Sequence, residues 1–129
     1  MSEIRVTTLK DTAGSNSSTA AEIANGRAKV WVNWNGAGTV AVRADYGVNT
    51  ITDNGDQQYT VNFSSAFSDA NYCAVYTTSS ATSTWYTFAN VHTGSGGQNL
   101  TANSSNIRVL AKALNGSDDS NYNMLACWR

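Results

Sequence analysis

The chain has 129 residues, a length that fits one domain, and only 13% of them are charged, about half of the usual share. Its formal net charge of −1, without any run of lysine or arginine, argues against a protein that binds nucleic acid through its phosphates. No apolar stretch approaches a membrane span and the first ten residues lack the apolar core of a signal peptide, so we expect synthesis in a cytoplasm and no membrane insertion.

The N-terminal part of the chain predicts a short strand, a loop and a single helix. The strand falls in "SEIRVTTLK", and the loop is the run of small residues "DTAGSNSSTA". Thr19 and Glu22 have the spacing of a capping box, and Gly26 follows the run "AAEIAN" as a stop signal. We therefore expect a helix of about two turns over residues 20–25.

The next segment, "AKVWVNWNGAGTVAV", predicts two strands joined by a glycine-rich turn. Val30, Val32 and Trp34 alternate onto one face, as a strand with one buried side requires. Trp31 falls on the opposite face. Either a partner subunit covers its ring, or the ring lies in a second core layer, for example under the helix at 20–25.

The stretch "TITDNGDQQYTVNF" predicts a hairpin. The Asn-Gly pair at 54–55 is favoured in a two-residue turn because both central positions need positive φ. That turn would set Thr50 opposite Tyr59 and Val48 opposite Val61.

Further strands are predicted in "NYCAVYTT", "STWYTFANV", "SNIRVLAKAL" and "NMLACWR". The chain contains no proline and few charges, which are the usual protection of exposed edge strands. Several of the strands are also apolar on both faces. We therefore expect symmetric assembly to cover these edges.

The whole pattern predicts an all-β fold, an antiparallel β-sandwich of jelly-roll-like type with one short N-terminal helix. We divide the chain into an N-terminal strand and loop (1–19), which serves as an attachment or assembly segment, and a β-sandwich domain (20–129) that includes the helix.

The sequence offers little for catalysis. His92 is the only histidine, so it cannot form a familiar zinc site without carboxylates, and no CxxC, HExxH or GxSxG motif occurs. The Asp-Asp pair at 118–119 lacks the spacing of a calcium loop and is expected in a solvated turn. Cys73 and Cys127 are expected as buried free thiols. We predict no catalytic residue, no metal, no cofactor and no enzymatic activity.

Aromatic residues are the better candidates for a site. Trp85 and Tyr86 are adjacent on a strand and point to opposite faces, so at least one leaves the local core. Together with His92 they are candidates for binding a receptor or glycan, with interface or core packing as the alternative. Trp31 and Trp34 are the candidates for a subunit interface.

Three stretches carry a family resemblance: "GRAKVWVNWNG" (26–36), "TITDNG" (50–55) and "YTVNFSSAFSDANY" (59–72). With the closing "NMLACWR", they resemble a domain widespread in bacteriophage and prophage proteins of tail fibres and other virion structures. The likeness spans nearly the whole chain and includes no catalytic motif. The thiols and Trp34 depart from the family pattern, as packing substitutions would.

This resemblance implies a homotrimer located in a virion, with other virion proteins as partners. We therefore expect a non-enzymatic structural protein, part of a tail fibre or similar appendage, including a tip that contacts a host cell-surface glycan. The alternatives are a capsid decoration or head-fibre protein and a carbohydrate-binding module. A hydrolase of surface polysaccharide would need paired carboxylates, and none stand out among the nine acidic residues.

Overall fold

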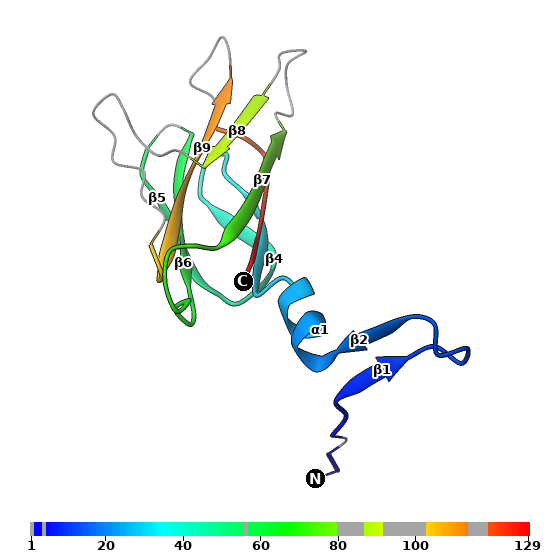
Figure 1. Cartoon of the computed structure of the whole chain (residues 1–129). Helices are drawn as coiled ribbons and strands as arrows, with labels where there is room; N and C mark the ends of the chain where they lie inside the picture. Colours follow the sequence, from blue (N-terminus) through cyan, green and yellow to red (C-terminus); the bar gives the residue numbers. More distant parts are fainter. Residues whose placement is uncertain (1, 4, 56, 80–86, 92–102, 114–118) are drawn as a thin grey trace.

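The computed structural model describes residues 2–3, 5–55, 57–79, 87–91, 103–113 and 119–129. Figure 1 shows two parts: a sandwich of β-strands, and a hairpin and helix that extend from one end of it. We call the hairpin and helix, residues 8–26, the N-terminal module.

The N-terminal module begins with two short strands, β1 (Thr8–Lys10) and β2 (Ser17–Thr19), which pair antiparallel. Helix α1 (Ala20–Gly26) follows at once and confirms the predicted helix. Its capping box is complete: the Glu22 N–H donates to the Thr19 hydroxyl, and the Thr19 N–H donates to the Glu22 carboxylate over 2.7 Å. Hydrogen bonds to the Glu22 carboxylate, first from the Thr19 N–H and then from the Thr19 hydroxyl, lower the pKa of Glu22.

No residue of α1, β1 or β2 is buried. Figure 1 shows the module reaching away from the sandwich rather than lying on it. The helix therefore groups with the N-terminal hairpin, whereas the sequence-based division placed it in the sandwich domain.

The sandwich consists of two four-stranded antiparallel sheets, which confirms the predicted all-β sandwich with one short helix. The first sheet contains, in spatial order, β4 (Ala41–Tyr46), β3 (Val30–Asn35), β10 (Tyr122–Trp128) and β7 (Cys73–Ser79). The second contains β5 (Val48–Asp53), β6 (Gln58–Phe63), β9 (Asn106–Ala113) and β8 (Thr87–Val91). The pairs β3–β4, β5–β6 and β8–β9 are hairpins within one sheet, and the other connections cross between the sheets.

The core lies between the two sheets, and Trp34 is at its centre. Its side chain is 0% exposed, stacks on Tyr76 with ring centroids 5.8 Å apart, and meets Tyr59 edge to face at 5.7 Å. Trp34 points inward because it follows Val30 and Val32 in the two-residue alternation of β3. The prediction that Trp34 lies at a subunit interface is therefore wrong.

Polar groups close one end of the core around Asp119. Its carboxylate accepts hydrogen bonds from the Gln57 N–H over 2.7 Å and from the Tyr59 hydroxyl over 2.9 Å. The backbone of Gly36 lies against the Tyr59 side chain. A Cβ at this position would lie 2.2 Å from the Tyr59 hydroxyl oxygen, so no larger residue fits without a shift of the ring. Asp119 is thus a structural acceptor and not the solvated turn residue that the sequence predicted.

The β5–β6 hairpin has a different register from the predicted one. Val61 faces Ile51 instead of Val48, a shift of three residues. The connection is longer than two residues, because the Gln57 N–H is bonded to Asp119 and its φ is 63°. The observed register brings Ile51 against the core.

Candidate functional site

The sheet of β4, β3, β10 and β7 buries one face in the core and leaves the opposite one, here called the outer face, uncovered by any described residue. Strand pairing places Trp31 beside both Tyr46 and Ala126, and Ala126 beside Val75, so these side chains share the outer face. Its large apolar residues are between 41% and 56% exposed: Trp31, Tyr46, Val75, Tyr122 and Met124.

Trp31 lies near the start of β3, one of the two inner strands of this sheet, and is 41% exposed. A shallow depression beside it, of about 380 Å³, is lined mainly by apolar groups from β3, β7 and β10, including Val75, Met124 and Trp128. Helix α1 has no buried residue and does not cover the ring. The interpretation of Trp31 as part of a second core layer under the helix is therefore wrong.

The four strands place one charged side chain on the outer face. The register shifts between Asn33 and Trp34, and the extra residue of β4 in this bulge is Arg43. Its guanidinium donates to the Asn33 side-chain oxygen over 3.2 Å and lies 4.4 Å from the centroid of the Tyr122 ring. The charge that these strands contribute is thus already engaged within the chain, and a second cation, Arg27, borders the face where it lines a small hollow with Trp31 and Tyr46.

The edges of this sheet are better protected than the sequence suggested. All six residues of β4 are exposed, but they include Arg43, Asp45 and the bulge, all of which discourage strand addition. At the other edge, β7 lies beside β8 of the second sheet. The feature that needs a cover is therefore the apolar outer face rather than an open edge.

The two cysteines lie on opposite faces of the sheet. Cys127 is buried in the core, and burial raises the pKa of its thiol to about 12. Cys73 is exposed and pairs with Trp128, the neighbour of Cys127, which places it on the outer face. The expectation of two buried thiols is wrong for Cys73.

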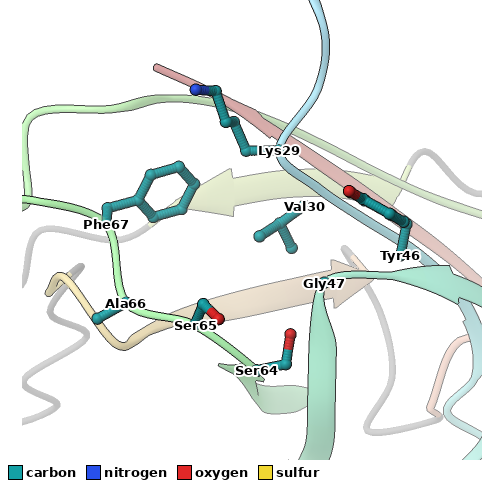
Figure 2. A pocket seen from close by; sticks show the side chains of 8 residues that line it. All are labelled: Lys29, Val30, Tyr46, Gly47, Ser64, Ser65, Ala66 and Phe67. Atoms are coloured by element: carbon teal, nitrogen blue, oxygen red, sulfur yellow. The ribbon is translucent and has the colours of Figure 1, made fainter. Parts of the chain in front are cut away.

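A second hollow, of about 340 Å³, lies at the end of the sandwich near the N-terminal module (Figure 2). It is lined by Lys29, Val30, Tyr46, Gly47, Ser64, Ser65, Ala66 and Phe67. We call it the end hollow. Sequence reasoning missed it because its residues come from three chain segments that no motif connects.

The predicted receptor-binding residues Trp85, Tyr86 and His92 lie outside the described residues, as does Asp118. Within the described ranges, no three His, Cys, Asp or Glu side chains gather as a metal site would require. The same ranges contain no helix that is both long and apolar enough to cross a membrane.

Comparisons of the chain with models of known protein families, with curated proteins and with solved structures return no match.

Proposed function

We propose that the protein is a non-enzymatic structural component of a bacteriophage particle, part of a tail fibre or a similar appendage. In this proposal the chain assembles as a homotrimer and buries the outer face between its copies. Support comes from the sequence resemblance at residues 26–36, 50–55 and 59–72, and from the exposed apolar face.

The observation that carries the proposal is the kind of side chain that the outer face exposes. Four strands spaced by about 4.8 Å, each of six or seven residues rising about 3.3 Å, span on the order of 400 Å². That area lies within the range of the largest apolar patch on a typical monomer, about 300–600 Å², and such patches are often functional. With exposed tryptophan, tyrosine and methionine side chains, the face has the composition of an interface core.

Further copies of this chain suit the face better than a charged partner does. Arg43, the charge on the face, is held by Asn33 and Tyr122, so little is left to select a partner of opposite sign. A stable interface buries about 800 Å² per partner, and the low end is about 600 Å². In a closed trimer each copy contacts two others, so the outer face, on the order of 400 Å², supplies only part of the buried area and other surface of the chain supplies the rest.

The N-terminal module suits the role of an attachment or assembly segment. A lone two-stranded hairpin and a seven-residue helix are both marginal in water. Here neither has a buried residue, and Leu9 and Ile23 are 55% and 44% exposed. Contacts with other copies or with another virion protein would supply the missing burial.

The location is tested on purified particles. Mass spectrometry of particles banded in a density gradient should detect the chain in a copy number divisible by three, and antibody labelling in electron microscopy should mark the tail or its appendages. Labelling over the capsid would favour the decoration protein instead. Absence from purified particles would overturn the structural role.

The interface is tested with the native thiols. Alkylation of the assembled protein at pH 8 should leave Cys73 largely unmodified, because the outer face is covered, and Cys127 unmodified, because it is in the core. Dilution to the monomer should release Cys73 alone. Rapid modification of Cys73 in the intact oligomer would place the interface elsewhere.

A further inference from the structure

The end hollow is formed where three segments of the chain meet. Lys29 and Val30 come from the start of β3, Tyr46 and Gly47 from the corner between β4 and β5, and residues 64–67 from the turn after β6. Figure 2 shows Phe67 and Tyr46 on opposite sides of Val30, with Ser64 and Ser65 along a third side. Its volume of about 340 Å³ is at the low end for small-ligand sites, about 300 to 1,000 Å³.

The backbone around the hollow is fixed. Gly47 has a φ of +74°, and a Cβ there would lie 2.6 Å from the Lys29 carbonyl oxygen, so the corner needs glycine. The Gly47 carbonyl accepts the Ser64 N–H over 2.9 Å, and the Phe67 N–H donates to the Ser104 carbonyl over 2.7 Å. A hollow held in this way does not have to be ordered when a ligand binds.

The aromatic wall is fixed as well. The Phe67 ring stacks on Tyr72 with centroids 4.6 Å apart and meets Phe63 edge to face at 5.2 Å. Together with Tyr46 opposite, it offers apolar surface to a flat ligand, while Val30 forms the floor between them.

The polar groups around the hollow are uncommitted. Within the described part of the chain, the hydroxyls of Tyr46, Ser64 and Ser65 and the amine of Lys29 make no hydrogen bond or ion pair with another residue. Among the described residues that line the hollow, none carries a carboxylate. An adjoining hollow shares Lys29 and Phe67 and adds Arg129, whose charge is paired with Asp69. Among the described lining residues, Lys29 is thus the cation without a partner; Figure 2 shows its side chain at the rim, with the amine turned away from Ser64 and Ser65, so a ligand carboxylate would meet it at the mouth of the hollow.

We propose that the end hollow binds an acidic saccharide unit, a pyranose ring that carries a carboxylate. The C–H face of the ring lies against Phe67 and Tyr46, the sugar hydroxyls exchange hydrogen bonds with Ser64 and Ser65, and the carboxylate pairs with Lys29. Hydroxyl groups both donate and accept, which suits a sugar. One lysine without a cluster of backbone N–H groups is a weak phosphate site, so the walls and hydroxyls favour a sugar acid. This inference goes beyond the proposed function. The two proposals share Tyr46, which lies on the outer face and also lines the end hollow, so sugar binding requires that assembly leave the hollow side of this ring accessible.

The test titrates the full-length protein with methyl β-glucuronide and, as the neutral match, methyl β-glucoside, followed by amide chemical shifts in NMR. We expect the glucuronide to shift the resonances of residues 29–30, 46–47 and 64–67. Lys29→Gln should weaken its binding about tenfold, since a hydrogen bond to a charged group is lost. The same variant should leave the weaker binding of the glucoside unchanged.

Two further variants serve as controls for the sugar titration. Lys10→Gln removes an exposed lysine of β1 and should leave glucuronide binding unchanged. Ser65→Ala should weaken both sugars by a few-fold. The proposal is overturned if the glucuronide shifts no resonance of the hollow at millimolar concentration, if Lys29→Gln binds it as tightly as the parent, or if the glucoside binds equally well. Because assembly is measured separately through Cys73, failure here leaves the homotrimer proposal standing.

Discussion

Strand β3 carries two tryptophans three residues apart, and they have opposite surroundings. Trp34 is 0% exposed between Tyr59 and Tyr76, whereas Trp31 is 41% exposed on the outer face. One side of β3 thus packs in the core of the single chain, and the other side is exposed and available to a binding partner. The pair shows that residue type alone does not separate a core residue from a candidate interface residue, whereas the face of the strand does.

The largest effect is expected at Trp34. Trp34→Ala removes the central ring of the core and should lower the free energy of unfolding by about 3–5 kcal/mol, as large-to-small aromatic changes do. Chemical denaturation followed by circular dichroism measures this loss.

Trp34→Phe is the matched control. The indole N–H is buried with no hydrogen-bond partner among the described residues, so the phenyl ring removes an unsatisfied donor along with some volume. The loss should be well below that of the alanine variant. Equal losses for both variants would mean that ring packing at this position contributes little.

A smaller effect, of another kind, is expected at Trp31. Trp31→Ala should weaken assembly by about 2 kcal/mol, a factor of about 30 in the dissociation constant, if the ring is an interface anchor. The unfolding free energy of the dissociated chain should change by no more than about 0.5 kcal/mol. Sedimentation velocity over a concentration series, combined with denaturation below the dissociation constant, separates the two quantities.

One result at Trp31 would contradict its role at an interface. If Trp31→Ala unfolds the chain without prior dissociation, the outer face is part of the fold after all. Trp31→Phe keeps an aromatic ring at the same position and should retain most of the assembly.

The smallest effect at neutral pH concerns the thiol on the inner face. Burial raises the pKa of Cys127 to about 12 from an ordinary value of about 9, so the native chain holds this proton more tightly than the unfolded chain does. The contribution of the protonated Cys127 thiol to the free energy of unfolding is fully present below about pH 9. It is lost as the pH rises from about 9 toward 12.

Denaturation midpoints should therefore be flat from pH 7 to 8.5 with respect to this group and fall above pH 9. Burial also raises the pKa of Tyr76 and acts in the same direction at still higher pH. Cys127→Ala should flatten the first part of the fall, whereas Cys73→Ala should change it much less, because burial is the larger cause of the raised pKa and the charge of Cys73 the smaller one. Identical pH profiles for the two variants would contradict the burial of Cys127.

Local sequence patterns predicted most of the fold. The alternation of Val30, Val32 and Trp34 indicated an inward face, and the Thr19–Glu22 capping box located the helix. That same alternation already argued against Trp34 as an interface residue. Of the two predicted interface residues, only Trp31 remains a candidate, and the alternation of β3 already placed it on the opposite face.

The features that the sequence did not predict depend on contacts between distant segments of the chain. The hairpin register shifted because Asp119, more than 60 positions away, takes the N–H of Gln57. The end hollow needs three segments at one corner, which no spacing rule connects. The edges proved protected because β7 lies beside β8 and Arg43 sits in a bulge, and both facts follow from pairing rather than from composition.

If further copies of the chain cover the outer face, the full-length protein is an oligomer in solution. The most direct measurement is the mass of the full-length protein in solution, by light scattering at micromolar concentration. We expect three times 13.7 kDa, about 41 kDa, for the parent protein and a shift toward 13.7 kDa for Trp31→Ala. A stable 13.7 kDa species for the parent protein, with Cys73 open to alkylation, would contradict it.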